Sequence, residues 1–166
     1  MTIYYTILQW DEYEVYLAAT GSGLIYLATG TEGEFEMKAW LEKHFPDCNL
    51  HYDQNKMSLY TKEISDYLQG KIECLESARQ LTGTDFQKEV WREVEKVAYG
   101  EVRSYADIAN NLGRPKAVRA VASAIGKNPL LFIIPCHRIV RKDGSLSGFR
   151  AGTDVKEKLL QLEQAK

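Results

Sequence analysis

The chain has 166 residues, of which 45% are hydrophobic and 11% aromatic, and it carries 21 Lys and Arg against 23 Asp and Glu. This length and apolar content exclude a disordered chain and predict one or two globular units with packed cores. The net charge of -2 conceals a difference between the two halves of the chain. Residues 1–80 have 13 acidic and 6 basic side chains, whereas residues 81–166 have 10 acidic and 15 basic ones. The second half alone is therefore suited to binding nucleic acid.

The N-terminal residues lack the features of a secretory or membrane-spanning signal. They contain no basic segment and reach acidic residues at Asp11, and no apolar run approaches the roughly 20 residues of a membrane helix. We therefore expect a protein that is not secreted, contacts no membrane, and is cytoplasmic, or nuclear in a eukaryote. The odd number of well-separated cysteines predicts thiols instead of a disulfide framework: Cys48, Cys74 and Cys136.

The sequence of the first half predicts a small α+β unit. Short β-branched and aromatic runs predict a meander of three antiparallel strands at Thr2–Leu8, Glu14–Ala19 and Leu24–Ala28. Apolar residues at helical spacing then predict helices at Met37–His44 and Ser58–Leu68. A zinc site with a fourth ligand is conceivable for His44, Cys48 and His51, but their spacing matches no strong zinc signature and favours a loop.

The pattern changes after a polar stretch that ends in Thr82-Gly83-Thr84, where we place a boundary between domains 1–82 and 83–166. A helix follows from Asp85 to Tyr99-Gly100. Its buried stripe is predicted to consist of Phe86, Val90, Val94 and Val97.

Two short helices follow in the sequence. Ser104 is an N-cap for a helix over Tyr105–Asn111, which Leu112-Gly113 ends. After Arg114-Pro115, a helix is predicted over Lys116–Ile125. Its inner side would carry Ala117, Ala120, Val121 and Ala124. This layout is that of a helix-turn-helix, although any pair of helices in a protein core gives the same pattern.

Cys136 follows the most apolar run of the chain, Leu130–Ile134, which reads as a buried strand that would present the thiol at a sheet edge. The cations His137, Arg138 and Arg141 would favour a reactive thiolate. A buried structural cysteine is the alternative that the residues leave open. The remaining chain predicts a turn at Lys142-Asp143-Gly144, a loop over Gly148–Gly152 and a final amphipathic helix over Asp154–Gln164.

Three blocks of sequence occur together in the second half: Pro135-Cys136-His137-Arg138-Ile139-Val140, Asn128-Pro129 and Ser104-Tyr105-Ala106-Asp107-Ile108-Ala109. With these blocks, the segment from Phe86 to Glu163 resembles the O6-alkylguanine-DNA alkyltransferases, also called methylated-DNA–protein-cysteine methyltransferases. The first half resembles that family only in general shape. The resemblance implies a small RNase H-like domain over 1–82, with an antiparallel sheet plus helices, and a mostly helical winged helix-turn-helix domain over 83–166.

The resemblance also implies DNA repair by direct transfer. Members flip an O6-alkylated guanine out of duplex DNA and move the alkyl group, a methyl for example, to their own cysteine, which inactivates the protein. By this resemblance Cys136 is the nucleophile, and His137 is the base, which acts through a water. Glu163 holds the base, Tyr105 donates to the guanine, and Asn128 braces the loop. This chemistry requires no cofactor or metal, would extend to O4-alkylthymine, and is expected of a monomer.

The remaining implied residues contact DNA or line the substrate pocket. Arg119 matches an arginine finger that enters through the minor groove and fills the space left by the flipped base. Other DNA contacts implied are Tyr105, Ala106, Arg114, Lys116, Lys127 and Lys142. Phe149 and Arg150 would line the pocket, with Phe149 standing where members usually have Tyr. The alternative is a DNA-binding module or winged-helix regulator without transfer, which the presence of the cysteine disfavours.

Overall fold

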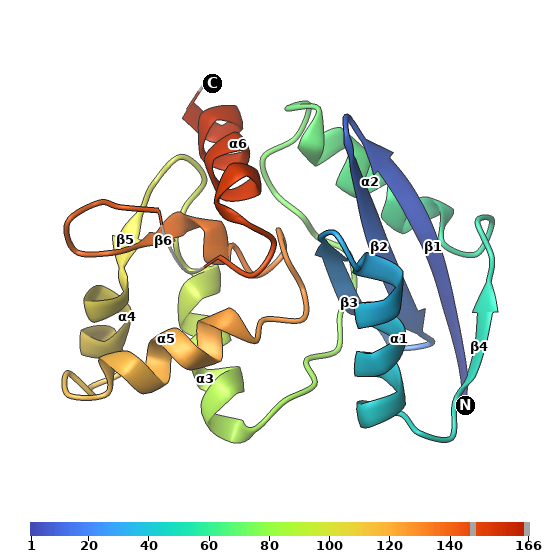
Figure 1. The fold of residues 1–166 in the computed structure, drawn as a ribbon, viewed down its shortest axis with the longest axis horizontal. Helices are drawn as coiled ribbons and strands as arrows, with labels where there is room; N and C mark the ends of the chain where they lie inside the picture. The colour runs from blue at the N-terminus through green and yellow to red at the C-terminus, as the bar shows by residue number, and fades with distance from the viewer. Residues whose placement is uncertain (147–148, 165–166) are drawn as a thin grey trace. The chain divides into compact units, whose positions relative to one another are not determined.

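The computed structural model describes residues 1–146 and 149–164. In these residues the chain has an α+β fold with a four-stranded sheet, a two-stranded sheet and six α-helices (Figure 1). It divides into two compact units, Met1–Thr82 and Gly83–Lys166. Within the described residues, no helix is both long enough and apolar enough to cross a bilayer.

The first unit is built on the meander predicted from its alternating runs. β1 (Thr2–Trp10), β2 (Tyr13–Thr20) and β3 (Gly23–Thr29) pair antiparallel in sequence order, which confirms that prediction. An unpredicted strand, β4 (Asn49–Tyr52), pairs parallel with β1 and gives the order β3-β2-β1-β4. β4 has no readable alternation because three of its four residues are exposed.

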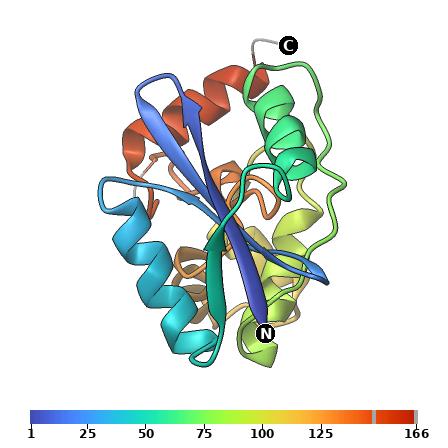
Figure 2. The same cartoon turned by 90° about the vertical axis from the view of Figure 1, so that its right-hand side faces the viewer.

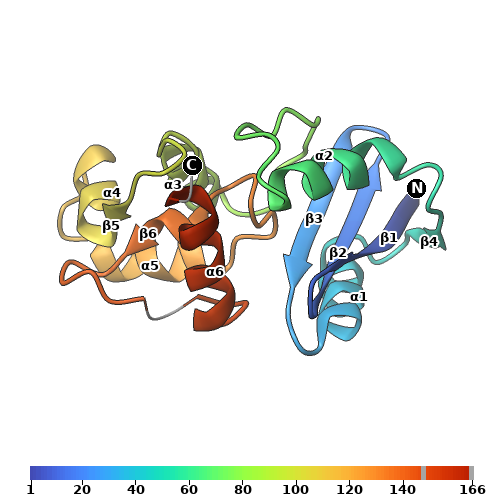
Figure 3. The same cartoon turned by 90° about the horizontal axis from the view of Figure 1, so that it is seen from above.

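Two helices cover the sheet from opposite sides (Figures 2 and 3). α1 (Gly33–His44) begins before the predicted start at Met37. Its first turn lies tightly on β2, since a Cβ on Gly33 would stand only 2.0 Å from Cε2 of Tyr16. α2 (Ser58–Leu68) has the bounds that the sequence predicted and packs against β1.

The segment with two histidines and Cys48 is folded into the first unit as ordinary structure. Nδ1 of His44 lies 2.9 Å from the carbonyl oxygen of Trp40, and the His44 ring stacks on the indole of that residue. His51 lies in β4 beside the ring of Tyr4. In the part of the chain that the structure describes, no three or more His, Cys, Asp or Glu are grouped so that they could hold a metal ion.

Two helices of the second unit, α3 (Asp85–Glu95) and α4 (Tyr105–Asn111), both pack on α5 (Val118–Gly126). α3 and α4 begin at capping boxes, in which the hydroxyls of Thr84 and Ser104 accept hydrogen bonds from backbone amides of the first turn. The predicted start of each of these two helices is confirmed.

The buried faces of α3 and α5 differ in detail from the prediction. Phe86 is only half-buried, and the core of α3 instead includes Trp91, whose Nε1 donates to the carbonyl oxygen of Ala124 at 2.9 Å. α5 begins at Val118, so Lys116 lies in the preceding turn, where the Arg114 carbonyl accepts from the Ala117 amide at 2.9 Å. Ala120 is exposed, because the buried face of α5 is formed by Val121, Ala124 and Ile125.

The prediction of a strand over Leu130–Ile134 is wrong. The run is buried throughout but folds as consecutive turns, with Phe132 at a φ of 70°. Its apolar composition reflects burial alone, which a turn in a core shares with a strand. A short strand does follow: β6 (Ile139–Val140) pairs parallel with β5 (Arg103–Ser104).

The end of the second unit matches most of its predicted elements. The turn at Lys142-Asp143-Gly144 is present, with Gly144 at a φ of 85° and its amide donating to the Arg141 carbonyl. Gly148 of the predicted loop lies outside the described residues. The last helix, α6 (Thr153–Gln164), starts one residue before its predicted beginning and packs on the 3-10 turn η1 (Cys136–Arg138).

Candidate active site

Cys136 lies at the start of η1 and not, as predicted, at a sheet edge. The residue is 4% exposed, and its backbone amide donates to the carbonyl oxygen of Ile134 at 2.7 Å. The carbonyl of Pro135 accepts from the amide of Arg138 at 2.9 Å and closes the turn. The apolar turns before Cys136 therefore hold its sulfur inside the second unit.

The side chain of Asn128 ties the turns before Cys136 together. It is 1% exposed, its Nδ2 donates to the carbonyl oxygen of Ile134 at 2.8 Å, and its Oδ1 accepts from the amide of Leu130 at 2.8 Å. Each of these bonds satisfies a buried backbone group in a segment without regular structure. The sequence places Asn128 in a loop, and the structure adds the two bonds by which it bridges that loop.

Glu163 on α6 accepts hydrogen bonds from three segments of the unit. Its Oε2 lies 2.7 Å from Nε2 of His137, and its two oxygens take the Nε and NH2 groups of Arg138 at 2.9 Å each. Its Oε1 also accepts from the backbone amide of Gly100 at 3.2 Å. Since the carboxylate only accepts, we assign the proton on this edge of the imidazole to Nε2.

The electrostatic setting of Cys136 differs from the predicted one. Burial raises the pKa of the thiol, and this outweighs the groups that lower it: the Asn128 side chain and the charges of Lys156 and Arg150. His137 is uncharged near neutrality, because burial lowers its pKa more than Glu163 raises it. Arg138 is engaged by Glu163. The cations that favour the thiolate are therefore not the three neighbours expected from sequence, His137, Arg138 and Arg141.

Two aromatic rings lie near Lys156, and one of them, Tyr105, also interacts with Cys136. Burial raises the pKa of Tyr105, and the nearby Cys136 raises it further, so the phenol stays protonated. Nζ of Lys156 lies 6.0 Å from the ring centre of Tyr105 and 5.8 Å from that of Phe149. Phe149 is half-buried and Arg150 exposed.

Sequence reasoning missed Lys156. A signal for it exists, because Val155, Lys156, Leu159 and Glu163 share one face of the final helix at helical spacing, and all four are buried. A lysine on the apolar face of an amphipathic helix is unusual, since burying an ammonium is costly without compensating contacts.

The residues predicted to contact DNA differ in whether their side chains already have a partner among the residues that the structure describes. Arg119 is exposed on the first turn of α5, and Lys116, Lys127 and Lys142 are also exposed. Arg114 instead forms an ion pair with Glu89, at 3.3 Å, and lies over the ring of Phe86. These residues lie on the same unit as Cys136.

A groove of about 500 Å³ lies beside the start of α4. Its lining residues come from β5, α4, β6 and the turn after β6, and they include Ala106, Arg103, Arg141 and Lys142. Of the predicted DNA contacts, this groove brings together Ala106 and Lys142.

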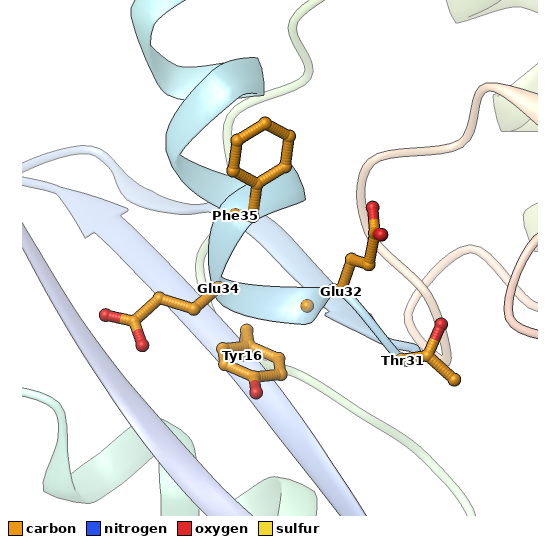
Figure 4. A pocket seen from close by; sticks show the side chains of 6 residues that line it. Tyr16, Thr31, Glu32, Glu34 and Phe35 are labelled. Carbon is orange, nitrogen blue, oxygen red and sulfur yellow. The ribbon is translucent and has the colours of Figure 1, made fainter.

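The first unit has a pocket of about 400 Å³ at the start of α1, with the Tyr16 ring below the helix and the Phe35 side chain directed away from that ring (Figure 4). Glu32 and Glu34 lie on either side of it (Figure 4). This lining contains no cysteine, histidine or lysine. The nucleophile and its buried partners are confined to the second unit.

Sequence comparison relates the chain to methylated-DNA–protein-cysteine methyltransferases. A family described as "6-O-methylguanine DNA methyltransferase, DNA binding domain" matches residues 85–165. An inducible methylated-DNA–protein-cysteine methyltransferase of Bacillus subtilis is 40% identical over 163 residues, which is 98% of this chain and 91% of the relative. One from Methanosarcina acetivorans is 34% identical over 161 residues, which is 97% and 98% of the two chains.

Solved structures share the fold along the chain. The crystal structure of Mycobacterium tuberculosis O6-methylguanine methyltransferase has a TM-score of 0.85 at 31% identity, over 98% of this chain and 93% of that one. Mycobacterium tuberculosis OGT in complex with DNA has a TM-score of 0.83 at 31% identity, with the same coverage.

Proposed function

The chain belongs to the family of methylated-DNA–protein-cysteine methyltransferases, and on that premise we propose that it removes the alkyl group from O6-alkylguanine in duplex DNA by transfer to Cys136. The observation that carries this proposal is the buried cluster in which Asn128 braces the approach to Cys136 and Glu163 holds His137. The product is a thioether, which has no ready leaving group, so each molecule reacts once.

The proposed step is a displacement at the alkyl carbon. His137 takes the thiol proton through a water molecule, and Glu163 stabilises and orients the ring, as in other nucleophile–base–orienter arrangements. The sulfur lone pair forms the S–C bond while the C–O6 bond breaks, and that electron pair stays on the guanine. The guanine gains one proton in place of the alkyl group, which balances the proton lost by the thiol.

Tyr105 is proposed to supply a proton or hydrogen bond to the departing guanine. The raised pKa of its phenol supports this role, because the hydroxyl remains a donor at neutral pH. Phe149 would stack on the flipped base, and Arg150 would line the same pocket. Phe149 has no hydroxyl, so it contributes no hydrogen bond from the ring.

We assign the DNA contacts to the second unit, with α4 and α5 as a helix-turn-helix and the turn after β6 as its wing. The exposed Arg119 would enter the minor groove and occupy the space of the flipped nucleotide. Phosphate contacts are assigned to Arg114, Lys116, Lys127 and Lys142, and backbone approach to Tyr105 and Ala106. For Arg114 this role requires exchange of its partner Glu89 for a phosphate.

The first unit is assigned as the RNase H-like domain of 1–82, and the second as the transferase domain of 83–166. The protein is proposed to act as a monomer. We extend the proposal to O4-alkylthymine, whose exocyclic alkoxy group offers the same carbon to the sulfur.

The test is a mass measurement on the nucleophile. The full chain is incubated with a duplex that contains one O6-methylguanine, and the tryptic peptide Asn128–Arg138 is weighed. We expect an increment of one methyl group, at most one per protein molecule. Cys136→Ser should abolish the increment, whereas the matched change Cys74→Ser at an exposed thiol should leave it intact. Tight binding of the duplex with an unmodified peptide would mean recognition without transfer.

A further inference from the structure

Lys156 has an unusual environment for a lysine. It lies in the first half of α6, its relative exposure is 0%, and its Nζ donates a hydrogen bond to the carbonyl oxygen of Ile139. Among the described residues, 1–146 and 149–164, it has no ion pair with a carboxylate. Burial of an ammonium without a counter-charge is strongly unfavourable, so a lysine here requires a specific compensation.

Once ionised, the sulfur of Cys136 is the anion available to Lys156, because α6 packs on η1, the turn that begins with Cys136. The two groups interact in both directions: the ammonium lowers the pKa of the thiol, and the ionised sulfur raises the pKa of Lys156, against the burial that lowers it. The contact of Nζ with the carbonyl of Ile139 fixes the lysine at the chain segment that follows η1.

The other charged groups around the sulfur are poorer candidates for this role. On η1, His137 is neutral near pH 7. The charge of Arg138, also on η1, is balanced by Glu163 of α6 through their hydrogen bonds. Arg141 and Arg150 are exposed, so water and salt screen their charges. From α4, Tyr105 contributes a neutral phenol.

We propose that Lys156 is a positioning residue for the transfer, whose buried ammonium stabilises the thiolate of Cys136 once His137 has taken the thiol proton. The proposal rests on Cys136 being the nucleophile of the proposed function. In this role Lys156 supplies a positive charge that the sequence blocks around Cys136 do not provide. A purely structural role, as a donor to the Ile139 carbonyl, is the competing explanation.

Two substitutions separate charge from hydrogen bonding. Lys156→Gln keeps a neutral donor for the Ile139 carbonyl and removes the charge. Lys156→Arg keeps the charge. Lys158→Gln on the same helix is the matched control for loss of a lysine from α6.

The measurement is the rate at which iodoacetamide alkylates Cys136 between about pH 5.5 and 9.5, followed by the mass of peptide Asn128–Arg138. For Lys156→Gln we expect the midpoint to rise by about one pH unit or more, so that the rate at pH 7 falls about tenfold while the high-pH plateau is unchanged. Lys156→Arg should stay within about threefold of the unchanged protein at pH 7, and Lys158→Gln should overlay it. An unchanged midpoint in Lys156→Gln, or a uniform drop at every pH, would overturn the proposal.

A second measurement does not require the lysine variant to fold. In protein labelled with ¹³C-lysine, the Lys156 ε-carbon is titrated with Cys136 present and after Cys136→Ser. Because the interaction is reciprocal, loss of the thiolate should lower the pKa of Lys156. An identical titration in both proteins would contradict the pairing. Both experiments use no DNA, so they give their answer whether or not the protein accepts a methyl group from the duplex, and failure of that transfer counts against the proposed function alone.

Discussion

Glu163 joins more of the site than any other single side chain described above. Its carboxylate is 3% exposed and accepts from the ring of His137, the guanidinium of Arg138 and the amide of Gly100. Arg138 also donates to the carbonyl oxygen of Val97 at 2.7 Å, so one arginine connects the turn after α3 to Glu163 of α6. A buried carboxylate with these partners both orients the base and balances the arginine charge.

Removal of that charge should cost stability and activity together. Glu163→Gln removes the carboxylate charge to which the buried Arg138 is hydrogen-bonded, so we expect unfolding in urea to need about 3 kcal/mol less free energy. Methyl transfer from duplex DNA should slow as well, since the imidazole loses its charged acceptor. The control is Glu157→Gln, an exposed glutamate on the same helix, which should change stability by less than about 0.5 kcal/mol. A Glu163→Gln protein as stable as the control would show that Arg138 finds compensation elsewhere.

At the scale of elements, α5 presents two different faces. Val121, Ala124 and Ile125 pack inward, and Arg119 and Ala120 face solvent at the start of the helix. A small side chain beside a long cationic one permits close approach of the helix backbone to a polyanion. The exposed face of α5 therefore contributes little to folding and is the part of the helix available for DNA.

Arg119→Ala tests the finger on two substrates. Repair of O6-methylguanine in duplex DNA should slow at least about tenfold, because a flipped base without a filler is less stable by more than about 1.4 kcal/mol. Reaction with free O6-benzylguanine needs no base flipping and should change less than about twofold. Arg92→Ala, at an exposed arginine of α3, is the matched control and should affect neither rate. Equal losses on both substrates would remove the finger assignment.

Elements with strong end signals were predictable from the sequence. The start of α4 follows from Ser104, which forms the predicted cap, and α2 has the predicted bounds, with Gly70 beyond its end at a φ of 76°. β4 was not predictable, because its four residues are mostly exposed and its pairing with β1 is non-local.

The candidate site was partly predictable. The association of Cys136 with Glu163 came from the family resemblance, since nothing local links residues so far apart in sequence. The turns before Cys136 could not be told from a strand, because their order depends on the two bonds of the Asn128 amide. The raised pKa of the Cys136 thiol was also missed, because burial acts against the nearby cations and sequence proximity reports only the cations.

At the scale of the whole molecule, the excess of basic side chains and the proposed nucleophile lie in the same unit. Residues 81–166 carry 15 basic and 10 acidic side chains, and that part contains Cys136 and the exposed lysines assigned to phosphate contacts. The acidic residues of 1–80 turn this local excess into a net charge of -2. Binding of a polyanion should therefore depend on cations of the second unit and not on the total charge.

The salt dependence of DNA binding measures how many of those cations contact phosphates. The logarithm of the association constant for duplex DNA should fall linearly with the logarithm of salt concentration, by about 0.9 for each phosphate neutralised. Lys142→Ala should reduce that slope by about 1. Lys71→Ala, at an exposed lysine of the first unit, should leave the slope unchanged. The same reduction in both variants would show that the contacts extend to the first unit.

The placement of Lys156 and Glu163 on one helix couples reactivity to local unfolding. Detachment of α6 would remove the proposed thiolate partner and the partner of His137 in a single opening event, without disturbing the caps of α3 or α4. While α6 is detached, Cys136 and His137 lack both of these partners. Hydrogen exchange of the α6 amides would report the detached fraction directly, and solution conditions that loosen only this helix would separate Cys136 and His137 from these partners in a protein that is otherwise folded.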